Sequence, residues 1–196
     1  MDSISQITFQ NNKAFRMYVP KLTKSRHLFV ILLITLTFQQ CSSPKTFSWK
    51  TDKSDQILDG SVHKDILNNP EKFPWFYYGK QAYKPDTATV RILKGMDTSL
   101  YVMIFAGSWC ADTQKELPIF FKVAEAAGIN NSHIGVLMVD KNKQSAYFNV
   151  NAMEIRHIPT FIVYRNGKEL GRIVEKTEVS MEADLLKIAL LGNELK

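Results

Sequence analysis

The side chain of this sequence best placed for chemistry is Cys110. It follows an apolar β-type run at 100–106, which Gly107 and Ser108 interrupt just before Trp109 and the cysteine. After the cysteine, apolar residues recur at three- and four-residue spacing, which predicts a helix. Cys110 is therefore expected where a buried strand turns into the first turn of a helix. The free N–H groups and partial positive charge of a helix N-terminus stabilise a thiolate, so a cysteine there is a candidate nucleophile.

A free cysteine can also be a small buried hydrophobe without a chemical role. Here the neighbouring residues favour the nucleophile. The segment Trp109-Cys110-x-x-Thr113, with Pro118 eight residues after the cysteine, resembles the active-site segment of the thioredoxin family. That family carries Trp-Cys-x-x-Cys and a helix-kinking proline at the same spacing. The resemblance implies that Trp109, Cys110 and Thr113 belong to one active site.

A second segment of the same resemblance lies at 156–160. Ile158 and Pro159 match the cis-proline loop of the thioredoxin family. The match implies a cis peptide bond between these two residues, facing Cys110, whereas a cis X-Pro bond is otherwise found about once in twenty. Together with Trp109, the Ile158-Pro159 loop is expected to shape the groove in which a partner's peptide lies.

The resemblance covers about residues 86–191 and implies a thioredoxin-like three-layer α/β fold, with a central mixed β-sheet flanked by helices. Local patterns agree with this fold class. Asn166 and Gly167 lie between two β-type runs, which is typical of a hairpin. The apolar run 133–140 predicts a second buried strand, parallel to the strand at 100–106 because the intervening helix provides a crossover.

Two departures from the family pattern bear on function. Thr113 stands where thioredoxins carry a resolving cysteine, and Ile104 stands where they carry a buried acidic residue. Cys110 therefore cannot close a disulfide within its own motif. The first hypothesis is a thiol redox protein with monothiol chemistry, in which an external thiol resolves a mixed disulfide or a sulfenic acid on Cys110. The second is a non-catalytic binding module that keeps the groove.

Other side chains near Cys110 suggest supporting roles. Thr113 lies one helical turn away and can donate a hydrogen bond to the sulfur, or it is an ordinary helix residue. Asp112 complements the helix dipole, and its carboxylate would oppose a thiolate. We expect neither a metal nor another cofactor, because the spacing of the potential ligands matches no known pattern: Asp112, Glu116, Asp140 and His157.

The N-terminal region predicts a secretory signal. A cationic stretch with Lys24 and Arg26 precedes an apolar run at 28–38, too short for a bilayer span of about 20 residues. Cys41 follows, an order that resembles the processing site of bacterial lipoproteins, whose cysteine is lipidated. Gln40 departs from that pattern, in which a small residue is usual. An uncleaved signal anchor and an ordinary signal with a misplaced cysteine are the alternatives.

These patterns divide the chain into four segments. They are a leading stretch at 1–16, with Met17 as an alternative start, a signal peptide at 17–40, a tether and aromatic-rich N-terminal extension at 41–85, and the thioredoxin-like domain at 86–196. We expect the stretch 42–55 to be the tether.

Within the folded part, three local patterns predict elements. Apolar residues between 57 and 67 predict one face of a short helix, and the aromatic residues of 73–78 predict a cover on the core rather than a ligand platform. Asp86 or Thr87 is expected to cap the next helix, and Ser180 the last one. The inner faces of these two helices are expected to hold Val90, Ile92 and Leu93, and Met181, Leu185, Leu186, Ile188, Ala189 and Leu190.

The formal charge of +6 is concentrated near the N-terminus, where five basic residues precede Cys41 against one acid. The remainder is close to neutral, so we expect no nucleic-acid partner. The expected partners are proteins or small thiols and disulfides, and a membrane through lipid on Cys41. The expected location is the bacterial cell envelope, facing the periplasm or exterior. If Cys41 carries lipid, Cys110 is the only thiol of the chain's two cysteines.

Overall fold

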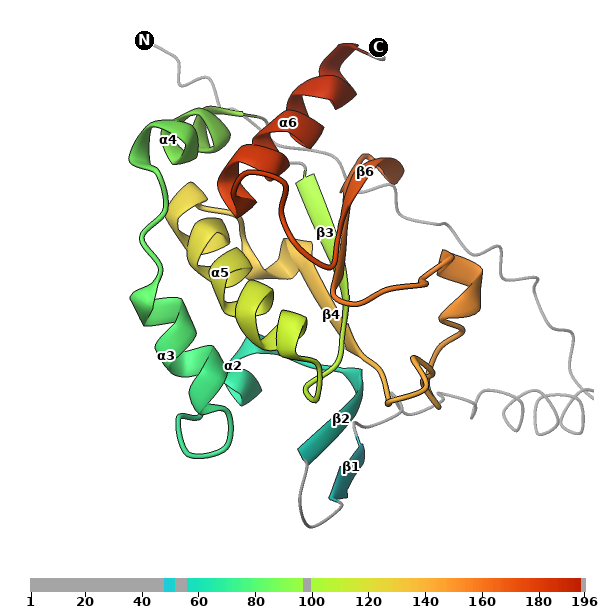
Figure 1. The fold of residues 1–196 in the computed structure, drawn as a ribbon. Coiled ribbons are helices and arrows are strands. Elements are labelled where there is room, and N and C mark those ends of the chain that lie inside the picture. Colours follow the sequence, from blue (N-terminus) through green and yellow to red (C-terminus); the bar gives the residue numbers. More distant parts are fainter. Residues whose placement is uncertain (1–47, 52–55, 97–99, 195–196) are drawn as a thin grey trace, which may run out of the picture. The chain divides into compact units, whose positions relative to one another are not determined.

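A mixed β-sheet organises the part of the chain that this computed structural model describes, residues 48–51, 56–96 and 100–194. Its six strands lie in the order β1-β2-β4-β3-β5-β6 (Figure 1). They are β1 (Ser48–Thr51), β2 (Gln56–Ser61), β3 (Leu100–Ala106), β4 (Ile134–Met138), β5 (Thr160–Arg165) and β6 (Lys168–Val174). The predicted mixed α/β fold is confirmed. The predicted signal peptide and Cys41 lie outside the described residues, within which no helix is long and apolar enough to cross a membrane.

The strand pairings around β3 follow the sequence prediction. β3 and β4 are parallel, from Val102 opposite Ile134 to Ala106 opposite Met138, and α5 (Ala111–Ala127) makes the crossover between them. β5 and β6 form an antiparallel hairpin. Its turn residues Asn166 and Gly167 have φ angles of 51° and 77°, and a two-residue type I′ hairpin turn requires positive φ at both positions.

Helices cover one face of the sheet and an irregular segment covers the other (Figure 1). Five helices contribute to the larger core: α2 (Lys64–Leu67), α3 (Pro74–Ala82), α4 (Thr87–Gly95), α5 and α6 (Met181–Glu194). The smaller cluster on the opposite face is built on Phe105 and Ile162, and the chain between β4 and β5 closes over it. That chain contains η2 (Asn151–Met153), whereas η1 (Asn131–His133) precedes β4.

The helix predicted between residues 57 and 67 is wrong. Residues 57–61 belong to β2, which pairs with β1 and β4, and only α2 (Lys64–Leu67) is helical. Gly60 has a φ of 103°, which no helix accommodates, and Leu58 is fully buried in the sheet. Within the predicted tether, Ser48–Thr51 forms β1 and so joins the sheet.

The helix caps agree with the sequence, and the inner faces agree in part. Asp86 Oδ2 accepts from Thr89 N at 2.7 Å, and Ser180 Oγ accepts from Ala183 N at 3.2 Å, as predicted. Ile92 and Leu190 are the exceptions, because they are 54% and 48% exposed. The buried stripe of each helix is narrower than its apolar pattern.

The aromatic residues of 73–78 cover the core in part: Phe73, Trp75 and Phe76 pack there, as predicted, whereas Tyr78 is 60% exposed. Phe73 and Phe76 are 1% and 0% exposed. The Phe76 ring meets that of Phe121 edge to face, with centroids 5.4 Å apart, which joins α3 to α5. Gly79 permits this close approach, because a Cβ there would lie 3.0 Å from Pro118 Cγ.

A buried carboxylate ties the start of α6 to the chain before α4. Glu182 is 2% exposed, and it accepts from the Tyr83 hydroxyl at 2.9 Å and from Asp86 N at 2.8 Å. Burial, followed by the hydrogen bond to Glu182, raises the pKa of Tyr83 to about 12.

The raised pKa of Tyr83 predicts a loss of stability at alkaline pH. The unfolded chain releases this proton near pH 10, while the folded chain keeps it until about pH 12. The stabilisation is therefore complete below pH 10 and is lost as the pH rises to about 12. After allowance for solvent screening, we expect a loss of about 1–2 kcal/mol. Urea unfolding of wild type and Tyr83→Phe between these pH values measures it. Equal slopes of unfolding free energy against pH would contradict the prediction.

Candidate active site

Cys110 occupies the junction between β3 and α5. It is the N-cap of α5, in an extended conformation with φ −87° and ψ 125°. Its N–H donates to Gly107 O at 2.9 Å, and its carbonyl accepts from Gln114 N at 2.9 Å. The cysteine is free and the residue is half-buried. The predicted strand-to-helix position of the cysteine is confirmed.

The cis-proline loop lies against this cysteine. The peptide bond between Ile158 and Pro159 is cis, as predicted. Cys110 Sγ is 3.6 Å from Ile158 O, within the range of a weak S–H···O hydrogen bond. The two segments that carry the family resemblance, which are 48 residues apart in the sequence, therefore meet at the sulfur.

Hydrogen bonds hold the loop in this position. Thr160 Oγ1 donates to His157 O at 2.6 Å, and Glu175 N donates to Pro159 O at 2.7 Å. His157 Nδ1 also lies 3.0 Å from Glu175 Oε1. These hydrogen bonds connect the proline loop to the end of β6, and they hold the Ile158 carbonyl next to Cys110.

Trp109 closes the other side of the site. Its indole Nε1 donates to Val139 O at 3.1 Å, at the end of β4. The ring lies so close to Gly107 that a Cβ there would be 2.8 Å from two indole atoms and 2.9 Å from Ile158 Cδ1. Ile158 belongs to the smaller hydrophobic cluster, and Trp109 and Cys110 pack against it.

Thr113 supports the backbone of the loop before Cys110. The residue is fully buried, and its Oγ1 accepts from Gly107 N at 3.2 Å. Among the described residues, its hydroxyl makes no bond to the Cys110 sulfur. Of the two roles weighed for Thr113, the bond to the sulfur is not formed, because the turn at 107–110 brings the Gly107 N–H to the threonine hydroxyl instead.

Ser108 and Gln114 also support the loop, and sequence reasoning missed both. Ser108 Oγ accepts from Leu58 N in β2 at 3.0 Å, and Ser108 O accepts from Gln114 Nε2 at 2.8 Å. No sequence motif marks either residue. Ser108 Oγ bonds a backbone N–H 50 residues away, and Gln114 bonds a backbone carbonyl on the other side of the turn. The loop before Cys110 is therefore held from β2, α5 and β4.

The four acidic and histidine side chains weighed as metal ligands have separate places. Asp112 is exposed in the first turn of α5, as predicted, and His157 pairs with Glu175. Asp140 accepts from the N–H groups of Asn142 and Gln144, both at 2.9 Å. No group of three His, Cys, Asp or Glu side chains in the described part of the chain could hold a metal ion.

Two further buried residues, Ile104 in β3 and Glu116 in α5, bear on proton transfer at this site. Ile104 is fully buried in β3, so position 104 offers no proton acceptor. Glu116 is 2% exposed, and its Oε1 lies 3.2 Å from Lys115 Nζ. The sequence suggested only a metal-ligand role for Glu116. Its buried carboxylate could have been noticed as a charged residue among the apolar positions of α5.

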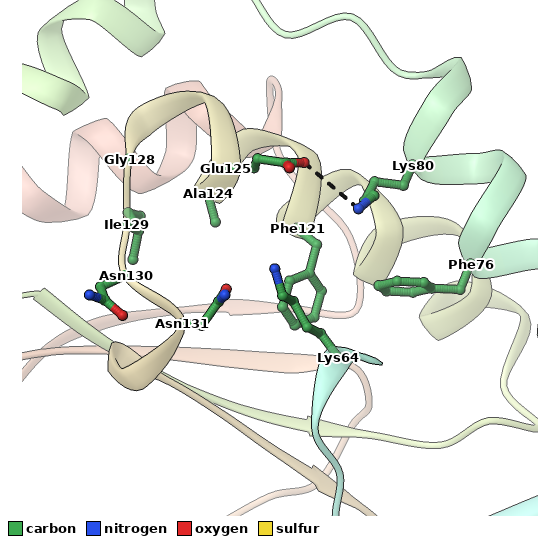
Figure 2. Close-up of a pocket in the computed structure, with 10 residues that line it drawn as sticks. All are labelled: Lys64, Phe76, Lys80, Phe121, Ala124, Glu125, Gly128, Ile129, Asn130 and Asn131. Atoms are coloured by element: carbon green, nitrogen blue, oxygen red, sulfur yellow. Dashed lines mark ion pairs between the residues drawn. The ribbon is translucent and has the colours of Figure 1, made fainter. Parts of the chain in front are cut away.

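A cavity of about 390 Å³ lies at the other end of α5 (Figure 2). Lys64, Lys80 and Asn131 are among its lining residues, and Lys80 Nζ is 3.7 Å from Glu125 Oε2. It extends to Gly128, which a helix rise of 1.5 Å per residue places about 27 Å from Cys110. The cavity is therefore not part of the cysteine site.

Comparisons with known proteins agree with this geometry. The chain is 30% identical to thioredoxin H-type 1 of Nicotiana tabacum over 100 residues, 49% of this chain and 72% of that protein. It is 27% identical to a thioredoxin of Coprinus comatus over 84 residues, 43% of this chain and 76% of that protein. It is 34% identical to chloroplastic thioredoxin Y of Oryza sativa subsp. japonica over 68 residues, but this match spans only 38% of that protein and 35% of this chain.

A solved structure and a family model complete the comparison. The crystal structure of an HIV epitope-scaffold is similar in fold, with a TM-score of 0.50 and 15% identity over 66% of this chain and 92% of that one. The model of the family described as thioredoxin matches residues 78–185, more than half of the sequence. The chain therefore belongs to the thioredoxin family.

Proposed function

We propose that this chain is a thiol redox protein that uses Cys110 alone. One observation carries the proposal: the Cys110 thiol is half-buried at the N-terminus of α5 and 3.6 Å from the carbonyl before the cis-proline. The position of a resolving cysteine holds Thr113, which is fully buried and bonded to Gly107 N. A reactive thiol without an internal partner suits exchange with external disulfides, and proteins carrying them are the expected partners.

The exchange proceeds in two steps. The Cys110 thiolate attacks one sulfur of a disulfide R–S–S–R′, an S–S bond forms between Cys110 and R, and R′–S⁻ leaves and takes up a proton. An external thiol R″–SH, as its thiolate, then attacks the R sulfur of the mixed disulfide. This step releases R–S–S–R″ and returns Cys110 as a thiolate. The sum is R–S–S–R′ plus R″–SH giving R–S–S–R″ plus R′–SH, so atoms and electrons balance.

A binding module without a redox cycle is the second candidate function. The observation that favours it is the packing behind Cys110. Thr113 and Ile104 are both fully buried, so neither a second thiol nor a carboxylate lies in these two places. Such a module would keep the groove beside Pro159 and bind a peptide without reacting with it.

The reactivity of Cys110 distinguishes these two functions. The full chain carrying Cys41→Ser has Cys110 as its one thiol, and its reaction with bis(2-hydroxyethyl) disulfide is followed by intact mass. We expect a mixed disulfide on the native chain that forms about tenfold faster than on the urea-unfolded chain, and that glutathione removes. The chain with both Cys41→Ser and Cys110→Ser is the control. A native chain that forms no adduct, while the unfolded chain does, would favour the binding module.

We further propose that Cys41 is lipidated and tethers the protein to a membrane of the cell envelope. The support is the order of a cationic stretch, the apolar run 28–38 and the cysteine. The polar stretch that follows would begin the connection to the folded part.

Metabolic labelling in a bacterial host tests this tether. An alkyne-bearing fatty acid is expected to label the wild-type protein and not Cys41→Ala, and the wild type should fractionate with membranes. Lipid labelling of both proteins to the same extent, or a wild type found in the soluble fraction, would count against the proposal.

A further inference from the structure

Two cationic side chains border the loop that contacts Cys110. Lys143 Nζ donates to Arg156 O at 2.8 Å. Arg156 is two residues before Ile158, whose carbonyl is 3.6 Å from Cys110 Sγ. Because consecutive Cα atoms are about 3.8 Å apart, the Cα atoms of Arg156 and Ile158 are at most about 7.6 Å apart. The Lys143 ammonium therefore lies beside the loop that contacts Cys110, and the Arg156 side chain begins on the same loop.

The fold fixes the ammonium group of Lys143. The lysine lies in a turn that Asp140 organises, since its carboxylate accepts from Asn142 N and Gln144 N and its carbonyl accepts from Lys143 N, each at 2.9 Å. The Lys143 side chain then reaches across to the carbonyl of Arg156. An exposed lysine side chain is ordinarily mobile. In Lys143 both the backbone N–H and the ammonium group are hydrogen-bonded, so its positive charge has a defined position.

Arg156 has its charge available for a partner. The residue is exposed, and its guanidinium has no hydrogen bond or ion pair among the described residues. Two acids belong to the same region: Glu154, two residues before Arg156, is exposed, and Glu175 Oε1 lies 3.0 Å from His157 Nδ1. On the helix side of Cys110, the exposed carboxylate of Asp112 carries the opposite sign. Lys143 and Arg156 thus meet at the proline loop, and Asp112 lies in the first turn of α5.

We infer that Lys143 and Arg156 form a carboxylate-binding subsite, so that Cys110 reacts preferentially with disulfides flanked by acidic groups. The inference rests on the disulfide exchange proposed above and adds the class of partner, an acidic segment of a disulfide-bearing protein. A carboxylate beside the attacked sulfur would be attracted by the two cations, while a cationic partner would be repelled.

Three small disulfides of different charge test the subsite: 3,3′-dithiodipropionate with two carboxylates, neutral bis(2-hydroxyethyl) disulfide, and cystamine with two ammonium groups. Their rates of adduct formation are measured on the full chain with Cys41→Ser at about 0.05 M ionic strength. Each rate is divided by that of glutathione with the same disulfide, which removes intrinsic reactivity. Because one thiol is compared with three probes, effects on the thiolate itself cancel in their ratios.

We expect Lys143→Gln/Arg156→Gln to lower the ratio of the anionic to the neutral rate about threefold, as two charges about 8–10 Å from a carboxylate predict. The ratio of the cationic to the neutral rate should rise. Arg156→Gln alone, which removes no hydrogen bond or ion pair among the described residues, should give about half of the effect on a logarithmic scale. The effects should fade at high salt.

Lys122→Glu is the matched control. It changes the net charge by the same two units, but on α5 about 18 Å from Cys110 by helix rise, so its ratios should stay near those of the reference chain. Equal ratios in the reference chain and the double variant, with normal reaction of the neutral disulfide, would overturn the subsite and leave the exchange reaction intact. A Cys110 that reacts with none of the three disulfides, the neutral one included, would overturn the proposed function itself.

Discussion

Gly107→Ala should destabilise the chain by about 2–3 kcal/mol and slow the reaction of Cys110 with disulfides. A methyl group at this position would lie 2.8 Å from the Trp109 indole and 2.9 Å from Ile158 Cδ1. The terminal methyl of Ile158 can turn away, but the indole is a rigid plane. Trp109 would have to leave its hydrogen bond to Val139 O. The substitution therefore acts on both walls of the site at once.

Urea unfolding and the rate of mixed-disulfide formation measure the two effects of Gly107→Ala. Gly95→Ala is the matched control, because a Cβ at Gly95, the last residue of α4, meets no atom within 4 Å. That control should be neutral or slightly stabilising, since alanine favours a helix over glycine. A Gly107→Ala chain as stable and as reactive as wild type would show that Trp109 does not depend on this contact.

The elements around Cys110 were predictable because their signals are local. The apolar run of β3, the helical spacing after the cysteine and the Asn166-Gly167 turn each depend on a few adjacent residues. The segment at 57–67 was not predictable in this way. Its apolar residues happen to follow helical spacing, but pairing with β1 and β4 decides its conformation. Gly60 also lies against the ring of Tyr147, a residue far along the chain, and a Cβ at Gly60 would be 3.0 Å from Tyr147 Cδ2.

The residues that hold the candidate site in place were also not predictable from local sequence patterns. Trp109, Cys110 and the Ile158-Pro159 loop could be named from motifs, and the structure brings the cysteine and the loop together. The hydrogen bond from Leu58 N to Ser108 Oγ could not, because it joins residues 50 positions apart through the misassigned strand β2. Hydrogen bonds between a side chain and a distant backbone leave no periodic pattern in a sequence, so sequence analysis finds the reacting group before its supports.

Thr113→Cys should give the chain an internal disulfide with Cys110. Residues three apart in the first turn of a helix are neighbours on its surface, so the two sulfur atoms can meet. Thr113 is fully buried and Cys110 is half-buried. Cys110 would therefore attack an external disulfide, and the buried thiol of the variant would resolve the adduct. The loss of the hydrogen bond from Gly107 N to Thr113 Oγ1 should cost about 1 kcal/mol, because sulfur is a weak acceptor.

The Thr113→Cys variant is best studied in the full chain with Cys41→Ser, by intact mass after oxidation with diamide. We expect the loss of two hydrogen atoms in this variant, and release of an adduct from Cys110 without added glutathione. Asp112→Cys is the matched control, because residues two apart on a helix do not face each other. Disulfide formation is a fairer measure than turnover, since Ile104 leaves the variant without the buried acid of the thioredoxin pattern. A Thr113→Cys chain that forms no internal disulfide, in a protein whose Cys110 also fails to react with external disulfides, would leave the binding module as the better account of this site.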